Sequence, residues 1–467
     1  MSSARDYPTD VAYPYTFIPC LAPAWLDHVA MISGFAPPSR VGGFAWCDLG
    51  CGQGLTATIL AATHLGGRFC GIDFIAAHIE NARRFAAECA VKNVEFHDID
   101  FSAAVETDFE GFDYIVSHGV YSWVDEQSQT SLLRFVDRHL KPGGLAYVSY
   151  YAMPGRAADL PFQRLVRALG LTLSGDTPKR CVEAIEIVNK LTGLKAPALV
   201  GSPMAVRLKE HPTDFQLAYL SHELMSANWN PLCVTDFRAA MRSIGLVPVG
   251  SATLIENYDS FVLGRAARRT LAAIADLDTR ELVRDFLIDQ FFRRDVLVRR
   301  GRVLNEAEQR SQLLASSFAL VHPVDGIEYT MKTPAGRLRY DNAVARNMVA
   351  AFAAGPRQLV EISTEFGLAS EDVLANALIL SAAGALRPVE ESRIPTRNLN
   401  AAIHRRLGRS EEIRFLALPC GTALPIDDAL LRQIKARGTT NDGNRPEWPT
   451  FLAAHGVWPV PISLRPD

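Results

Sequence analysis

The residues best suited to do chemistry in this chain are an acid and the glycines that follow it at alternate positions. Asp48 precedes Gly50, Gly52 and Gly54, and an apolar run over residues 44–47 leads into them. Because glycine has no Cβ and takes positive φ at little cost, such a loop lets the backbone approach a ligand closely. A helix that starts directly after the loop would point its free N–H groups and positive dipole end at that ligand. The pattern predicts a nucleotide-binding loop, although Gly-x-Gly also occurs in ordinary tight turns.

A second acid lies one strand–helix–strand unit further along the chain. Residues 68–73 have the pattern of a strand that ends in Asp73. A carboxylate at a strand end, about twenty residues past the glycines, can accept hydrogen bonds from both hydroxyls of a ribose. Asp73 is therefore the predicted ribose ligand, and Phe74 would lie beside the base.

Helical and extended patterns then alternate up to residue 150. Residues 76–90 have helical periodicity, residues 94–101 are a short strand that runs into an acidic turn, and residues 112–117 are a fourth strand. A Pro-Gly-Gly turn at 142–144 leads into a fifth strand over 145–150. This alternation is typical of an α/β fold with a parallel sheet.

These pieces together resemble the core of the class I methyltransferases that use S-adenosylmethionine (SAM). A dinucleotide enzyme would carry Gly-x-Gly-x-x-Gly, and this chain has Leu55 and Thr56 where its third glycine would fall. The resemblance implies a Rossmann-like seven-stranded core and SAM as the cofactor. It also implies that Asp100, with Asp98 as a substitute, holds the amino group of the adenine.

The resemblance places the cofactor site at the strand ends. Its predicted members are the loop, the two acidic strand ends and the end of the fourth strand: Asp48, Gly50, Cys51, Gly52, Gly54, Asp73, Phe74, Asp100, Phe101, Ser117 and His118.

His118 and Tyr121 are the predicted catalytic residues. His118 follows the fourth strand, where a general base or an acceptor-positioning group would stand beside the transferred methyl group. The alternative is a structural histidine that hydrogen-bonds the loop backbone or SAM. An aromatic channel would help an acceptor amine to lose its proton, because apolar surroundings disfavour the charged form. The predicted channel residues, besides Tyr121, are Tyr13, Tyr15, Trp123, Tyr150 and Tyr151.

Further motifs resemble one bacterial family, the class I methyltransferases that carry a methyltransferase regulatory domain. These motifs occupy residues 118–124, 147–155, 219–223, 285–287 and 292–296. The family includes rickettsial protein lysine methyltransferases that act on an outer membrane protein. The resemblance is strongest over residues 7–300 and weak after 325, and it implies a protein lysine as the acceptor.

The chain departs from the family at two places. Relatives typically have Tyr-Asn where this chain has Tyr150 and Tyr151, which indicates a different acceptor contact. The Asn-Pro-Pro-Tyr motif of amide and base methylases is absent, and residues 117–120 read Ser-His-Gly-Val instead. Methylation of a nucleobase or a glutamine amide is therefore disfavoured.

The length of 467 residues corresponds to two or three domains. We expect an N-terminal arm or lid over 1–40 and a methyltransferase domain over 41–265, with a helical insertion at about 156–230. An α+β regulatory domain would cover 266–345, and a mainly helical, winged-helix-like module would cover 346–467. The aromatic and proline-rich arm suits a lid over a ligand, but it could equally be a segment packed elsewhere.

The expected seven-stranded sheet needs two more strands after the fifth. Apolar runs at 246–249 and 260–263 are the predicted pair, so the sheet would end near residue 265. Residues 293–301 form an arginine-flanked run that predicts an exposed or edge strand, either a solvated face or a site for an acidic partner.

Composition excludes several classes of function. With 48% hydrophobic and 21% charged residues the chain is typical of globular proteins, and a net charge of −3 argues against a general nucleic-acid binder. No apolar run is long enough to insert into a membrane and no signal peptide is evident, which predicts a cytoplasmic protein. The eight cysteines include no Cys-x-x-Cys pair, so neither a metal site nor disulfides are expected.

Three functions remain in competition. The first is a protein lysine methyltransferase whose extra modules dock the substrate protein. The second is a small-molecule O- or N-methyltransferase, acting on a secondary metabolite or an envelope glycan precursor, whose extra modules serve to form a homodimer. The third is a non-catalytic SAM-binding regulator, which would have lost Asp73 or the glycines; both are present.

Overall fold

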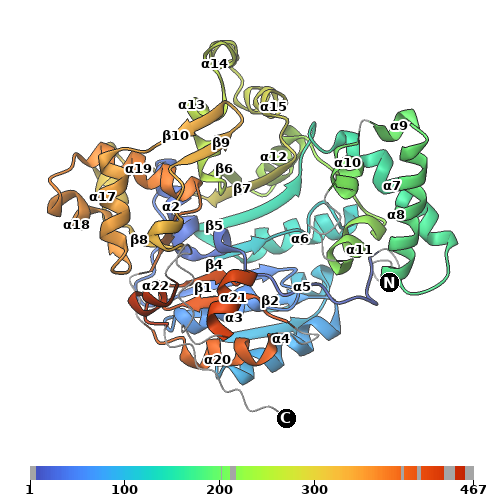
Figure 1. Cartoon of the computed structure of the whole chain (residues 1–467), viewed down its shortest axis with the longest axis horizontal. Helices are drawn as coiled ribbons and strands as arrows, with labels where there is room; N and C mark the ends of the chain where they lie inside the picture. Colours follow the sequence, from blue (N-terminus) through green and yellow to red (C-terminus); the bar gives the residue numbers. More distant parts are fainter. Residues whose placement is uncertain are drawn as a thin grey trace.

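The computed structural model describes residues 7–200, 202–210, 217–390, 394–407, 412–435 and 448–457. Its centre is a seven-stranded sheet in the order β3-β2-β1-β4-β5-β7-β6 (Figure 1). The strands are β1 (Phe44–Leu49), β2 (Gly67–Asp73), β3 (Val94–Asp98), β4 (Phe112–Ser117), β5 (Leu140–Tyr151), β6 (Leu246–Ser251) and β7 (Phe292–Arg299). The first five strands are parallel, and β7 is antiparallel to both of its neighbours. This arrangement confirms the Rossmann-like α/β core.

Helices cover both faces of this sheet because its strands are apolar on both sides. Successive side chains of a strand point to opposite faces, so Trp46 enters one core and Cys47 the other. The first core is shared with α2 (Pro23–Ile32), α3 (Leu55–Thr63) and α4 (Ala76–Glu88). The second is shared with α5 (Phe101–Glu106), α6 (Glu126–His139) and α12 (Val234–Ser243). The strand order reverses between β1 and β4, which is where ligands bind in open α/β sheets.

The strand that completes the sheet comes from a later segment than predicted. Residues 260–263 do not form a strand: the helix α13 (Asp259–Val262) occupies the first three of them. The missing strand is β7, which lies between β5 and β6, so the prediction of an exposed or edge strand at 293–301 was wrong. Val296, Leu297 and Val298 are fully buried there. The sheet therefore extends well past residue 265.

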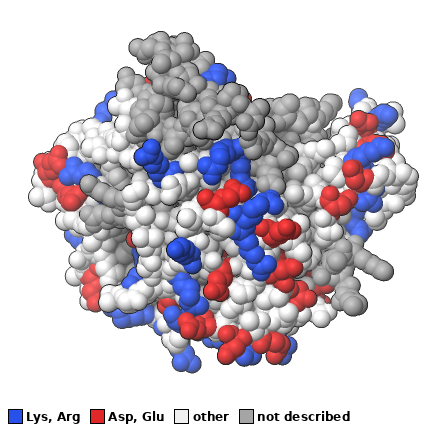
Figure 2. All heavy atoms as spheres, turned by 90° about the horizontal axis from the view of Figure 1, so that it is seen from below, with Lys and Arg blue, Asp and Glu red and all other residues white. Residues whose placement is uncertain are grey.

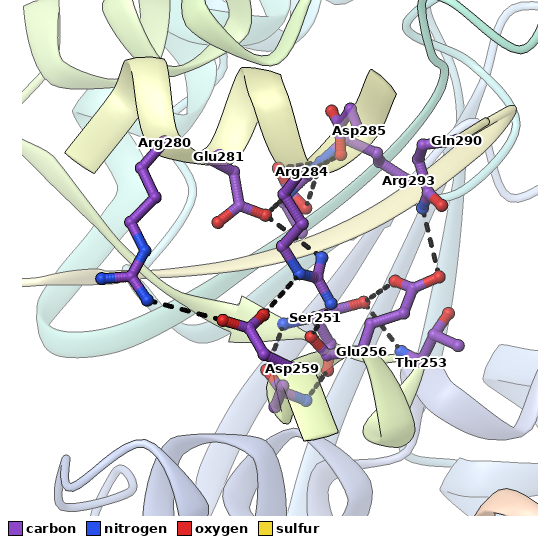
Figure 3. Close-up of polar contacts among 12 residues, drawn as sticks. Ser251, Thr253, Glu256, Asp259, Arg280, Glu281, Arg284, Asp285, Gln290 and Arg293 are labelled. Carbon is purple, nitrogen blue, oxygen red and sulfur yellow. Dashed lines mark hydrogen bonds and ion pairs between the residues drawn. The ribbon is translucent and has the colours of Figure 1, made fainter. Parts of the chain in front are cut away.

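Charged side chains at the start of β7 are buried in a closed network. Arg293 is 5% exposed and pairs with Asp285 at 2.6 Å, with Glu281 at 3.1 Å and with Asp295 at 3.1 Å. Glu281 and Asp285 belong to α15 (Leu277–Ile288), and Figure 3 shows them converging with Arg293 and Arg284 between that helix and the sheet. Buried charges are tolerated when they are paired in this way, and the pairing ties α15 to the sheet.

A helical insertion follows β5 and lies to one side of the sheet, at the right of Figure 1. It packs around its own apolar core. Its helices are α7 (Leu160–Thr172), α8 (Thr177–Gly193), α9 (Pro197–Val200), α10 (Pro203–Glu210) and α11 (Leu217–Met225). These helices lie within residues 156–230, where a helical insertion was expected. After β6 the chain forms α14 (Arg265–Ala272) and then α15.

The C-terminal half combines helices with short strands. A three-stranded sheet in the order β11-β8-β12 packs with the helices at the left of Figure 1. The elements of this part of the chain are α16 (Glu306–Leu314), β8 (Ser317–Leu320), β9 (Thr330–Thr333), β10 (Gly336–Arg339), α17 (Ala343–Phe352), β11 (Arg357–Gln358), α18 (Leu359–Glu365), α19 (Ser370–Ala382) and β12 (Leu386–Val389). Because β8 pairs with strands beyond residue 345, this sheet joins segments on both sides of the expected domain boundary.

The last elements pack on the helices α3 and α4, which cover one face of the large sheet. They are α20 (Arg397–Arg406), β13 (Phe415–Leu418), β14 (Thr422–Pro425), α21 (Asp428–Lys435) and α22 (Trp448–Ala454). Ala402 and Ile403 of α20 share the core of α3 and α4, and Arg406 pairs with Glu88 of α4 at 2.9 Å. Arg40 joins Asp27 of α2 at 2.6 Å and also pairs with Glu390. Apolar contacts and ion pairs therefore attach the C-terminal part to the core.

The surface carries charges of both signs. On the face seen from below, Figure 2 shows Lys and Arg side chains intermingled with Asp and Glu side chains. Among the described residues, no helix combines the length and the hydropathy that a membrane crossing needs.

Candidate active site

A cavity of about 250 Å³ lies at the carboxyl ends of β1, β2 and β4. This is the position that the reversal of strand order predicts for a ligand. Twelve of the residues predicted from the sequence line it: Tyr13, Asp48, Gly50, Cys51, Gly52, Gly54, Asp73, Phe74, Asp100, Phe101, His118 and Trp123.

The glycine loop has a backbone shape that other residues adopt with strain. The φ angles of Gly50, Gly52 and Gly54 are +85°, +52° and +68°. A Cβ on Gly50 would overlap the side chain of Val120, whereas a Cβ on Gly52 would meet no atom within 4 Å. The loop therefore needs glycine for its conformation throughout, and at Gly50 and Gly54 for close packing as well.

Asp73 holds this loop in place. Its Oδ2 accepts a hydrogen bond from the backbone N–H of Gly52 at 2.9 Å, and its Oδ1 accepts one from the N–H of Ile75 at 2.9 Å. Each carboxylate oxygen can accept a second hydrogen bond, so the side chain still has acceptor capacity for a ligand hydroxyl. Sequence reasoning assigned Asp73 to the ribose and missed this second task of fixing the loop.

Asp48 is the most perturbed acid of the cavity. The side chain is 5% exposed, and burial together with the charge of Asp73 raises its pKa to about 8. A buried carboxyl of this kind is costly to ionise unless a cation lies beside it. SAM carries a positively charged ammonium and a positively charged sulfur, so the acid pair and the glycine loop fit that cofactor.

Further acidic and aromatic side chains extend the cavity wall beyond β2. Asp100 caps the N-terminus of α5 by accepting a hydrogen bond from the N–H of Ala103 at 2.8 Å. Ser102 donates to the same oxygen, Oδ1, at 2.6 Å and lowers the pKa of Asp100. Its substitute Asp98 is not among the lining residues, whereas Phe74 and Phe101 are.

His118 lines the cavity but is held as a neutral side chain. Its Nδ1 lies 2.8 Å from the hydroxyl of Tyr147, and the two rings stack at 5.9 Å. Burial, helped by the charge of Arg294, lowers the pKa of His118 to about 3. A histidine with so low a pKa is a weak base and is better suited to hydrogen bonding. The neighbouring Ser117 lies behind the wall, where its hydroxyl donates to the carbonyl of Leu49 at 3.0 Å.

Three of the predicted aromatic residues lie in the protein core and do not reach the cavity. Tyr121 and Tyr150 both pack on Phe237 of α12, and the hydroxyl of Tyr150 donates to Asp295 at 3.0 Å. Tyr15 packs on Phe85, with a ring-centroid distance of 6.3 Å. Alternation along β5 explains the different positions of Tyr150 and its neighbour, since successive side chains of a strand face opposite sides.

Tyr151 lies directly behind the cavity wall. Its ring is 4.5 Å from that of the lining residue Trp123, and its hydroxyl donates to Glu223 of α11 at 2.5 Å. Glu223 is 2% exposed and was missed as a site residue. The signal that could have found it is an acid within an apolar, helical segment, because a carboxylate on a buried helix face requires partners.

The N-terminal arm lies across the cavity. Tyr7 and Tyr13 line it, and both rings pack on His222 of α11 at 5.1 and 5.2 Å. The backbone N–H of Tyr13 donates to His78 at 3.2 Å, and Gln53 donates to its carbonyl at 3.1 Å. Tyr7 was also missed as a site residue. These contacts connect the arm to the glycine loop and to the insertion at once.

Two family models match this chain. Residues 42–192 match a methyltransferase domain, and residues 216–299 match a predicted methyltransferase regulatory domain. An uncharacterized protein of Synechocystis sp. is 29% identical over 458 residues, which cover 96% of this chain and 90% of that protein.

The fold is also that of a solved structure. PKMT2 from Rickettsia typhi superimposes with a TM-score of 0.65 at 18% identity, over 94% of this chain and 96% of that one. Its complex with AdoHcy gives a TM-score of 0.67 at 18% identity, with 92% of each chain covered. The similarity includes the insertion and the C-terminal half as well as the central sheet, because the covered share exceeds any single module.

Proposed function

Since this chain is a SAM-dependent methyltransferase that carries a methyltransferase regulatory domain, we propose that its acceptor is the side-chain amine of a lysine in a protein. The observation that carries the proposal is the aromatic part of the cavity wall, formed by Tyr7, Tyr13 and Trp123. The similarity in fold to PKMT2 and the resemblance to rickettsial protein lysine methyltransferases support the same acceptor. In this proposal the protein works in the cytoplasm.

The residues of the chain would divide the work between cofactor and acceptor. SAM, when bound, supplies a methyl group on a positively charged sulfur. Asp48 would pair with the positive charge of the cofactor, and Asp73 would orient its ribose while holding the loop. The aromatic wall would exclude water from the reacting amine, which must lose its proton before it can accept the methyl group. His118 would accept or donate a hydrogen bond and help to place the amine within about 3–3.5 Å of the methyl group.

The N-terminal arm acts as a lid in this proposal. Tyr7 and Tyr13 form part of the wall, so a ligand would pass the arm as it enters. Tyr7→Ala removes the ring that packs on His222 and is expected to speed SAM dissociation several-fold with little effect on association. Stopped-flow fluorescence measures both rates, with Tyr329→Ala, a tyrosine of the C-terminal half, as control. Equal dissociation rates in both variants would argue for a merely packed arm.

A second candidate is a small-molecule O- or N-methyltransferase. The arm closes over a cavity of about 250 Å³, which favours a small acceptor. The test is incubation of the protein with methyl-labelled SAM and an extract of its own host, followed by separation into proteins and small molecules. Methyl-lysine in tryptic peptides supports the first proposal. Label in small molecules alone selects the second, and Asp73→Asn serves as the control that removes cofactor binding.

A further inference from the structure

Glu223 is a buried carboxylate without a cationic partner of its own. Its Oε1 accepts hydrogen bonds from the hydroxyl of Tyr151 at 2.5 Å and from Nε1 of Trp229 at 2.7 Å. Both donors are neutral, and within the described part of the chain no Lys or Arg forms an ion pair with it. Arg156 is close, but its guanidinium pairs with Asp159 at 3.0 Å and lies 4.0 Å over the Tyr151 ring. Burial raises the pKa of Glu223, and the hydrogen bonds and the charge of Arg156 offset that rise only in part, so a cation nearby would stabilise the carboxylate form.

Aromatic rings connect this carboxylate to the cavity. The ring of Tyr151 lies 4.5 Å from Trp123, which lines the cavity, and 5.1 Å from Trp229. Tyr7 and Tyr13 approach from the arm: their pKa values are raised by burial and, in smaller part, by the charge of Glu223. The Glu223 side chain therefore lies one side chain behind the aromatic wall. Its ionised carboxylate makes the electrostatic potential at that wall more negative.

The neighbouring histidine adds no competing positive charge. His222 precedes Glu223 and is 2% exposed. Burial, helped by the proximity of His78, lowers its pKa to about 4, so it is neutral near pH 7. The faces of Trp and Tyr rings attract cations, and a negative group behind them strengthens that attraction.

We propose that Trp123, with Tyr151 and Glu223 behind it, forms the subsite that first binds the acceptor as a positively charged amine, before that amine loses its proton. Glu223 is a positioning residue in this inference, because it acts through the two rings. The ligand class is a primary or methylated alkylammonium, such as the end of a lysine side chain. The inference rests on the proposed amine acceptor and adds the residues that select it. A neutral acceptor such as an alcohol would gain nothing from this subsite.

The test compares a charged and a neutral probe of the same size. n-Pentylammonium and 1-pentanol are titrated against the full-length protein saturated with S-adenosylhomocysteine, and binding is followed by ligand-observed NMR. The wild type is expected to prefer the ammonium by about tenfold. Glu223→Gln keeps an oxygen for Tyr151 and Trp229 but loses the charge, so the preference should fall to near unity while S-adenosylhomocysteine binds as before.

Matched variants separate charge from folding. Glu256→Gln removes another partly buried carboxylate, which does not line the cavity and accepts a hydrogen bond from the hydroxyl of Ser251 at 2.7 Å. This variant should keep the full preference. Trp123→Leu removes the lining ring together with its hydrogen bond to Glu223, and should lose the preference even if Glu223→Gln fails to fold. Equal binding of both probes to the wild type, or an intact preference in Glu223→Gln, overturns the inference. Failure of the proposed function is recognised separately, by the absence of methyl-lysine in the labelling experiment.

Discussion

At the scale of single residues, Asp48 and the loop glycines line the cavity in which the cofactor would bind. Asp48 is kept from ionising by its burial and by Asp73, and Asp73 spends part of its hydrogen-bonding capacity on the loop. The site is thus built around charges that a cationic ligand would stabilise.

Proton release on cofactor binding is the first expected outcome. The pKa of Asp48 is about 8 in the free protein, above its ordinary value of 3.8, so the group is mostly protonated at pH 7. A bound cation favours the carboxylate, so binding should expel a proton below pH 8 and affinity should rise as pH approaches 8. Calorimetry in buffers of different ionisation enthalpy measures the released proton. Asp48→Asn should show none.

The same group contributes to stability with the opposite trend. Because its pKa is raised on folding, the contribution is fully present below the unfolded pKa and is lost as pH rises through about 8. The free protein should therefore lose unfolding free energy as the pH rises from about 4 to about 8, and Asp48→Asn should reduce that loss. A wild-type profile that is identical to that of Asp48→Asn would contradict the assignment.

Gly50→Ala and Gly52→Ala separate backbone strain from crowding. Both positions have positive φ, but only at Gly50 would the new Cβ overlap Val120. Gly52→Ala should cost about 1 kcal/mol of unfolding free energy and Gly50→Ala about 1–3 kcal/mol more. Denaturant unfolding measures both values. The double variant Gly50→Ala/Val120→Ala should recover the difference, and equal costs for the two single variants would show that crowding is unimportant.

At the scale of elements, β7 and α15 form one unit with the sheet. The strand lies between β5 and β6, and its first residues are charged yet buried. The network around Arg293 neutralises acids from α15 and from β7 itself (Figure 3). This part of the segment that matches the regulatory domain is structurally inseparable from the sheet.

Arg293→Met is expected to destabilise the protein by about 3–5 kcal/mol, because it leaves buried carboxylates without their cation. Burial already raises the pKa of Asp285 to about 7 against the opposing charge of Arg293, and without that charge the pKa should rise further. Thermal unfolding measures the loss. The control is Arg302→Met, which breaks a surface pair with Glu308 and should cost less than about 1 kcal/mol. Similar losses in both variants would mean that the network contributes little.

At the scale of the whole molecule, segments far apart in sequence complete the same core. Ala402, Ile403 and Ala417 of the C-terminal part share the core of the first helical layer. Arg40 reaches both Asp27 and Glu390, which joins the beginning of the chain to its C-terminal half. The catalytic core is therefore stabilised by residues from almost the full length of the chain.

A chain that ends at residue 265 should fail to bind SAM, and one that ends at residue 305 should still bind it. The shorter chain lacks β7, so β5 and β6 have open edges that favour aggregation. The longer chain keeps all seven strands but loses the C-terminal cover, which should lower its melting temperature. Gel filtration and calorimetry with SAM measure both properties. Undiminished SAM affinity in the shorter chain would contradict this role of β7.

The local features of this protein were predictable from sequence because they depend on neighbouring residues. The glycine loop, the acid that ends β2 and the helix α4 follow from spacing and periodicity over a few residues, and the α/β core was confirmed. The resemblance correctly implied SAM as the cofactor and a methyltransferase regulatory domain.

Only the tertiary structure decided which distant residues meet. The place of β7 depends on pairing with β5, about 150 residues earlier in the chain, and local periodicity carries no information about such pairing. The phase of β5 turned Tyr150 into the core and Tyr151 toward Trp123, although both are tyrosines at adjacent positions. Glu223 became a neighbour of the cavity because the insertion folds against β5. Long-range packing, which sums many weak contacts over the whole chain, determined all three positions.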